Sequence, residues 1–196
     1  MNFWKRKRNP EQNQTLTTDQ AATIENNPPT PELLTQVSEN PEIEETFKAQ
    51  YPLVFPFSYA AIVEDEKNEV KYSLLEPTLT DIDKQSVNEI KSILWDELSI
   101  NTKSFKEKTS SEDFLKLKIL ETAIEYEIDV DVNTLGKYQY YIVRDFLGFG
   151  KIDGIMHDPN IEDVSCDGIN IPVFVWHRKY ESIPSNVIFE TAEELE

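Results

Sequence analysis

Residues 144–168 read RDFLGFGKIDGIMHDPNIEDVSCDG, and the pattern changes within this stretch from helix to strand. All five glycines of the chain lie within residues 136–168, so sharp changes of backbone direction are concentrated there. The preceding helix is expected to stop at Gly148, because glycine often ends a helix in a left-handed conformation. Gly150 and Pro159 then provide the backbone freedom and the stop that are needed to start the strand IEDVS.

Three helices are expected before the end of this turn, over residues 81–98, 112–128 and 135–147, because apolar residues recur there at helical spacing. Thr109 and Glu112 form a capping-box pattern at the start of the second helix. The residues expected on the buried faces are Ile82, Val87, Ile90, Leu94 and Leu98 in the first helix, Phe114, Leu117, Leu120, Ile124 and Ile128 in the second, and Leu135, Tyr138, Ile142 and Phe146 in the third.

Strands are expected on both sides of the helices. Residues 56–77 hold two stretches rich in Val, Ile, Tyr and Ala around a polar tip at 64–69, which is typical of a β-hairpin. Farther on, residues 152–160 predict a short helical turn, and IEDVSCDG, IPVFVWHRKY and SIPSNVIFE predict three short strands. A last helix is expected to begin at Thr191. The expected core residues of these strands are Val173, Val175, Ile183 and Phe189.

Together these elements predict a mixed α/β fold of the α+β kind, in two parts. Residues 51–132 are expected to form a first small domain from the hairpin and helices, and residues 133–196 the beginning of a second mixed domain. Residues 1–50 are expected to be a disordered polar tail with a short helix near 42–50, because most of this stretch has too few apolar side chains to offset its ordering entropy.

Composition excludes several classes of function. Nineteen basic residues stand against thirty-seven acidic ones, and the net charge of −18 would repel nucleic acid. The acidic surface either keeps the protein in solution or meets a basic partner. No apolar run has the length of a membrane span or a secretory signal, and Cys166 has no cysteine to pair with, so a cytoplasmic location is expected.

The motifs that carry chemistry are incomplete. Neither Gly136-Lys137 nor Gly150-Lys151 has the glycine and the Ser or Thr of a phosphate-binding loop. The run DVDVNTLG at 129–136 lacks the glycine of a calcium loop, so we interpret it as a helix connection whose side chains cap backbone amides. We therefore expect no catalytic residue, no cofactor and no metal ion in this chain.

The stretch from Arg144 to Ser182 resembles the signature that precedes the motor domain in archaeal secretion ATPases of the type II/type IV secretion protein E family. This family includes archaellum and archaeal type IV pilus motors. The blocks YPLVFPFSYAAIV from Tyr51 and YSLLEPTLT from Tyr72 resemble the first domain of the same family. The resemblance runs from about Tyr51 to Phe189, with the blocks in the expected order.

The resemblance implies a hexameric ring whose subunits carry N-terminal domains and a RecA-like motor that uses ATP and Mg²⁺. This chain ends before the Walker A loop and the Walker B carboxylate, so it would be a non-catalytic N-terminal portion. Implied partners are other ring subunits and the membrane platform protein of the machine. The alternative is a stand-alone acidic interaction module that shares the fold, and a more distant one is a small enzyme with an unrecognised site.

Two groups of residues are candidates for a role in such a machine. Arg144, Asp145, Gly148 and Gly150 would form a coupling element, in which the two charged residues pair either with the carboxylates of IEDVS or with a neighbouring subunit. The aromatic and basic tip, Phe3, Trp4, Lys5, Arg6, Lys7 and Arg8, suits an anionic membrane surface, which would place the protein at the inner face of the cell membrane; the other interpretation is an ordinary solvated terminus.

Overall fold

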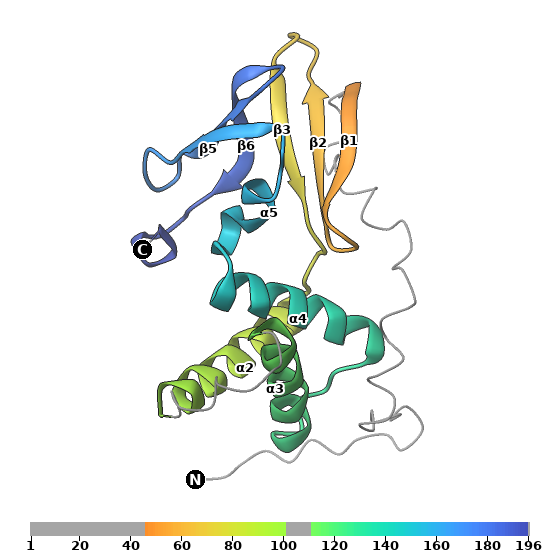
Figure 1. Cartoon of the computed structure of the whole chain (residues 1–196), viewed down its shortest axis with the longest axis vertical. Helices are drawn as coiled ribbons and strands as arrows, with labels where there is room; N and C mark the ends of the chain where they lie inside the picture. The colour runs from red at the N-terminus through yellow and green to blue at the C-terminus, as the bar shows by residue number, and fades with distance from the viewer. Residues whose placement is uncertain (1–45, 101–110, 196) are drawn as a thin grey trace.

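The structure, a computed structural model, describes residues 46–100 and 111–195 and consists of a sheet layer and a helical layer (Figure 1). The sheet has six strands in the order β1-β2-β3-β6-β5-β4. The strands are β1 (Thr46–Val54), β2 (Ser58–Glu64), β3 (Val70–Leu75), β4 (Ile161–Ser165), β5 (Pro172–His177) and β6 (Glu181–Ile188). The expected mixed α/β fold, the hairpin and the three later strands are all confirmed.

The sheet contains three strands that precede the helices α2, α3 and α4 in the sequence and three strands that follow them. Every strand pair is antiparallel except β3 with β6, which run parallel and meet where Tyr72 lies opposite Ser185. Parallel neighbours require a long connection, and here it contains the whole helical layer. The first and last thirds of the described chain therefore share one sheet.

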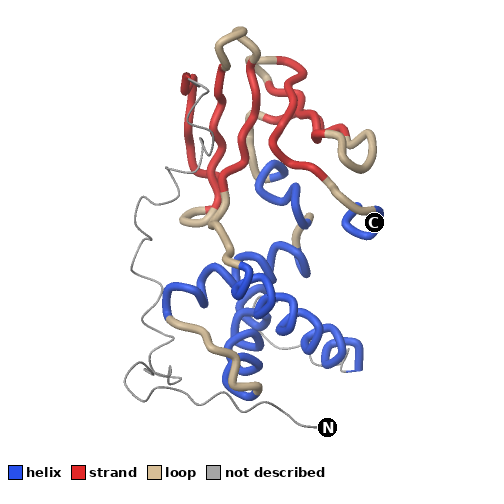
Figure 2. The backbone as a smooth tube through the Cα atoms, turned by 180° about the vertical axis from the view of Figure 1, so that it is seen from behind, coloured by secondary structure: helices blue, strands red, loops and turns tan. Residues whose placement is uncertain are grey.

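The core of the sheet layer lies on its concave side, where the short helix α5 (Asp153–Met156) packs (Figure 2). Ile155 of this helix is fully buried. It belongs to one apolar cluster with side chains from β2, β3, β5 and β6. Val173, Val175, Ile183 and Phe189 belong to the same cluster, so their expected place in the core is confirmed.

The helical layer contains α2 (Asp81–Ile100), α3 (Ser111–Glu125) and α4 (Val132–Leu147). Their common core includes Ile90 and Leu94 of α2, Ile119 of α3 and Ile142 of α4, all with no exposed surface. Asp131 caps α4 by accepting hydrogen bonds from the backbone amides of Asn133 and Thr134, which agrees with the capping role expected of this connection.

Two of the expected buried faces are wrong in part. In α2, Ile82 is 75% exposed; in α3, Leu117 and Ile124 are each 48% exposed. Leu120 is buried as expected, and the other buried residues of α3 are Leu115, Ile119, Thr122 and Ala123. This helix carries apolar side chains on two faces, so spacing alone was unable to select the one that packs.

The beginning of the described chain also differs from expectation. Residues 46–50 belong to β1 and not to a short helix, and order begins before Tyr51. Apolar side chains alternate with polar ones from Phe47 to Leu53, which is the strand period. Ala49, Tyr51 and Leu53 pack against the sheet core. The remainder of the predicted helix and tail lies outside the described residues.

The expected division between residues 132 and 133 does not coincide with a change in packing. It separates α4 from α2 and α3, with which α4 shares a core, and it separates β3 from its neighbour β6. The packing instead divides the described chain into a helical layer and a sheet layer. The sequence did not indicate this division, because local patterns do not determine the order of the strands in the sheet.

A pair of substitutions in α3 distinguishes its packed face from its exposed face. Ile119→Ala should lower the free energy of unfolding by about 2–5 kcal/mol, because it opens a cavity at a fully buried position. Leu117→Ala should lower it by less than about 1 kcal/mol, because half of that side chain is already in solvent. Urea denaturation of both variants measures the difference, and equal losses would contradict the assigned face.

Candidate functional site

The candidate coupling residues fall in residues 144–160, a segment that joins the helical layer to the sheet and is called the joint below. It contains the end of α4, the 3₁₀ turn η3 (Gly150–Ile152), α5 and the turn that leads into β4. Figure 1 shows α5 between α4 and the sheet. The joint is therefore placed where it can contact both layers at once.

Arg144 forms the helical side of the joint. Its side chain is only 9% exposed, and Nη1 donates hydrogen bonds to both carboxylate oxygens of Glu76, at 2.9 and 2.8 Å. Nε donates to Oδ1 of Asp145 at 2.8 Å, and the guanidinium lies 4.7 Å from the centre of the Tyr141 ring. Burial lowers the pKa of Arg144, but the two carboxylates outweigh this and raise it, so Arg144 stays charged.

This ion pair is the centre of a network that connects three segments. Glu76 lies in the link between β3 and α2, and its Oε1 also accepts a 2.6 Å hydrogen bond from the hydroxyl of Tyr140. Asp145 forms an ion pair with Lys91 of α2. Burial and the negative charge of Glu76 raise the pKa of Tyr140, which keeps its hydroxyl a donor. The network holds α4 against both α2 and the end of β3.

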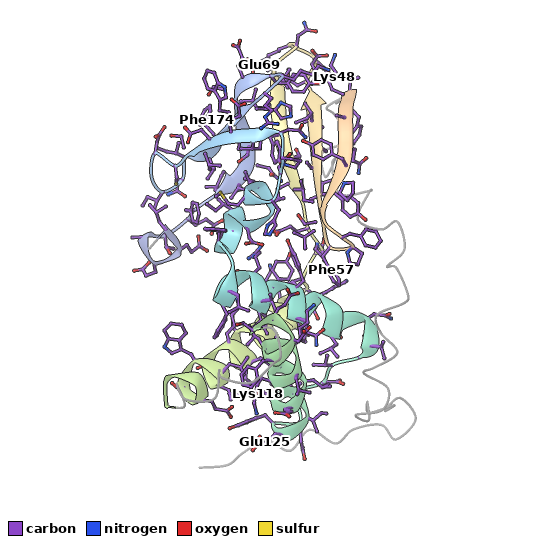
Figure 3. The ribbon with its side chains drawn as sticks, viewed as in Figure 1. Lys48, Phe57, Glu69, Lys118, Glu125 and Phe174 are labelled. Carbon is purple, nitrogen blue, oxygen red and sulfur yellow. The ribbon has the colours of Figure 1, made fainter. Side chains whose placement is uncertain are left out.

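Aromatic packing adds a second contact between the layers. Phe57, in the turn between β1 and β2, stacks on Tyr140 with ring centres 5.4 Å apart. Figure 3 shows Phe57 between the sheet and α4. A Cβ atom on Gly136 would lie 3.0 Å from Cζ of Phe57, so the small residue in α4 gives this ring its space.

Gly148 is required by a close contact. The backbone amide of Phe149 donates a 2.9 Å hydrogen bond to Oδ1 of Asp153, and a Cβ atom on Gly148 would lie only 2.1 Å from that oxygen. The φ angle of Gly148 is −103°, so the expected left-handed helix end is wrong at this position. The left-handed residue is Gly150, at φ +58°, and a Cβ atom there would meet nothing within 4 Å.

The sheet side of the joint is fixed by Gly154 and Asp158. A Cβ atom on Gly154 would lie 2.6 Å from Cδ1 of Leu74, so glycine allows α5 to touch the sheet. Oδ2 of the buried Asp158 accepts hydrogen bonds from the hydroxyls of Tyr51 at 2.7 Å and Tyr72 at 2.9 Å. Burial and Asp158 raise the pKa of both tyrosines.

The four predicted coupling residues lie together in the joint, but the expected pairing of Arg144 and Asp145 with the carboxylates of IEDVS is wrong. Arg144 and Asp145 bind Glu76 and Lys91, whereas Glu162 of β4 binds Arg178 at 3.2 Å. The alternative, a contact with a neighbouring subunit, stays a prediction. Five residues that hold the joint were not expected from the sequence: Glu76, Asp153, Asp158, Tyr51 and Tyr72. A local signal existed only for Asp158, which precedes Pro159 in a turn. The predicted membrane tip lies outside the described residues.

Chemically, the joint binds and positions; its polar groups already have partners within the chain. In residues 46–100 and 111–195 no three His, Cys, Asp or Glu side chains are grouped so as to hold a metal ion. Beside the joint lies an open cleft of about 400 Å³, whose lining includes Glu76, Tyr141 and Asn186. None of the described helices is long and apolar enough to cross a membrane.

Comparison with known proteins finds two similar chains in Methanocaldococcus jannaschii, both described as uncharacterized. MJ1288 is 37% identical over 126 residues, which are 64% of this chain and 50% of MJ1288. MJ0781 is 29% identical over 62 residues, which are 32% of this chain and 8% of MJ0781. The chain thus spans about half the length of one relative and a small part of the other. No family model matches the chain.

The two neighbouring glycines should respond differently to substitution. Gly148→Ala should destabilise the fold by about 1–3 kcal/mol, because its methyl group would overlap Asp153. Gly150→Asn should cost less than about 1 kcal/mol, because asparagine tolerates the left-handed region and the space is open. Thermal unfolding of the two variants measures the difference. A larger loss of stability for Gly150→Asn would show that the left-handed backbone at Gly150 matters more than the close contact at Gly148.

The buried ion pair gives a second prediction. Arg144→Met should lower the free energy of unfolding by about 3–5 kcal/mol, because Glu76 would keep its charge without its partner. The control Arg178→Met removes an exposed pair and should cost less than about 1 kcal/mol.

A double variant separates charge from packing. Adding Glu76→Gln to Arg144→Met removes the stranded charge while leaving an acceptor for Tyr140, so it should recover part of the lost stability. Denaturant titration measures the free energy of unfolding of the unsubstituted chain, of Arg144→Met, of Arg178→Met and of the double variant. No recovery would mean that the side chain of Arg144 acts through its packing alone.

Proposed function

We propose that this chain is a non-catalytic N-terminal portion of a secretion or pilus-assembly ATPase, and that it mediates contacts with neighbouring subunits and with the machinery. The observation that carries the proposal is the joint. One continuous segment, the one that resembles the family signature, is braced to the helices through Arg144 and to the sheet through Asp158.

The joint suits a part that transmits movement instead of performing chemistry. A motor that drives assembly needs its accessory domains to move as rigid bodies, since a soft link would absorb the displacement. Here the connection between layers has a buried ion pair in which one guanidinium nitrogen contacts both carboxylate oxygens, a stacked aromatic pair and two glycines that allow close contact. ATP and Mg²⁺ would be bound by the motor, and the phosphate loop would belong to it.

The relatives are compatible with this assignment. In MJ0781 the matched segment is 8% of the length, as expected for a module within a larger protein. The acidic charge of −18 favours a basic docking partner, such as the cytoplasmic face of a membrane platform protein.

The test is to isolate, from native cells, the polypeptide that contains these residues. An affinity tag can be inserted at Lys67, in the exposed turn between β2 and β3 and far from the joint. We expect a ring of six copies that hydrolyses ATP in the presence of Mg²⁺, whereas purified residues 1–196 show no turnover above background. Mass measurement and an ATPase assay read both quantities.

A clear contrary result is available. If the tagged polypeptide is complete at Glu196 and its assembly contains no nucleotide-hydrolysing protein, the proposal is wrong and the chain acts as an acidic interaction module. ATP turnover by residues 1–196 that persists through repeated purification would also overturn it.

A further inference from the structure

The strand β5 has one face in the main core of the sheet and one face that carries aromatic side chains. Val173 and Val175 belong to the main core. Side chains alternate along a strand, so Phe174 and Trp176 point to the opposite face, where Pro184 of β6 lies across from Phe174. Trp176 is 48% exposed, and Phe174 and Pro184 are partly exposed. This surface is called the aromatic face below.

The strand β4 lies at the edge of the sheet, directly beside the aromatic face. Figure 1 shows β5 on the side of the sheet opposite β1, and β4 follows β5 as the last strand in the order. Asp163 of β4 lies opposite Trp176, and Ser165 lies opposite Phe174; both residues of β4 are exposed. An edge strand turns the backbone N–H and C=O groups of alternate residues away from its neighbour, where another strand can bind them.

Charge decides which kind of strand fits this edge. Glu162 and Asp163 of β4 and Asp167 just after it are exposed acidic residues. Glu162 pairs with Arg178, whereas Asp163 faces solvent beside Trp176. A second copy of the chain would bring the same acidic residues to the contact, and like charges on paired strands are destabilising. A strand that carries Lys or Arg would be attracted instead.

The two rows of side chains across β4 and β5 define the partner further. A strand added to β4 would place one residue beside Asp163 and, two positions along on the same face, another beside Ser165. A Lys or Arg in the first position can pair with Asp163 and extend over Trp176, since neighbouring strands are only about 5 Å apart. An apolar side chain in the second position can pass over the small Ser165 to reach Phe174.

We propose that the edge of β4 and the aromatic face bind an extended basic segment of another protein. This segment adds to the sheet as a further strand and carries a Lys or Arg two positions from an apolar residue. The inference rests on the proposed function, because it gives the basic partner of that proposal a surface to bind. It requires neither nucleotide nor a motor, so peptide binding tests it separately from the ring and its ATP turnover.

A titration with a synthetic peptide tests the surface. The probe is the end-blocked peptide KTKTFTK, in which Lys and Phe share one face of a strand. The control KFKTTTK has the same composition and charge, but its Phe lies on the face opposite its lysines. With isotope-labelled residues 1–196, we expect amide shifts concentrated in β4 and β5 and a Kd for the probe at least about tenfold below that of the control. Equal Kd values, or shifts elsewhere, would overturn the proposal.

Matched substitutions identify the residues that bind the probe. Asp163→Lys should raise its Kd at least about tenfold, because attraction becomes repulsion. Glu89→Lys, on the exposed side of α2, changes the net charge equally and should leave the Kd within about twofold. Equal losses from these two variants would mean that only net charge matters, and the proposal would fail.

A second pair of variants leaves the charge of β4 unchanged and therefore remains informative if Asp163→Lys fails to fold. Trp176→Thr keeps a strand-forming residue but removes the ring, so it should weaken binding of the probe about tenfold. Trp95→Thr removes a more exposed ring from α2 and should have no effect. Unchanged binding by Trp176→Thr would show that the aromatic face takes no part, contrary to the proposal.

Sedimentation distinguishes a basic partner from a second copy of the chain. We expect the sedimentation of residues 1–196 to be the same before and after Asp163→Lys, because this edge is unsuited to self-pairing. A dimer that the probe peptide displaces would mean that a second copy occupies the edge of β4, and the proposal would be wrong.

Discussion

The burial of one positive charge constrains the centre of this structure. Arg144 is removed from solvent at the end of α4, and it can remain there only because Glu76 and Asp145 supply carboxylates at hydrogen-bonding distance. Glu76 directly follows β3, and Asp145 forms an ion pair with Lys91 of α2. The geometry of a single guanidinium thus fixes how three segments meet. A hydrophobic residue would fill the space but would not impose these directions.

Much of the architecture was accessible from the sequence, because it depends on local patterns. Helices α2, α3 and α4, the hairpin, the turn after Gly150 and the last three strands all follow from periodicity and turn residues. The strand β1 was missed although its side chains alternate, since the composition of the preceding residues suggested a tail. The face of α3 was wrong in part because Leu117 and Ile119 are equally apolar, and only packing in the core shared with α2 and α4 selects between them.

The contacts that hold the joint were beyond local reasoning. Glu76 is 68 residues from Arg144, and Lys91 is 54 residues from Asp145. No spacing rule connects them; they meet because α4 packs against α2 and against the link between β3 and α2. The three glycines of the joint make the same point. Gly150 is explained by its positive φ angle, but Gly148 and Gly154 are explained by a carboxylate and a leucine that the chain brings to them.

The composite sheet also limits how this molecule can move. β3 and β6 are neighbours, so the two ends of the described chain are held in one layer, and α4 is held to that layer by Arg144 and Phe57. Sliding the helices past the sheet would separate a buried charge from its partner, which costs several kcal/mol, while smaller tilts would keep the pair intact. A force applied to the helices is therefore passed to β3 through Glu76 and to β6 through the strand pairing. For a module proposed to sit on a motor, this makes the exposed surfaces, and not the inside of the module, the places where movement between parts can occur.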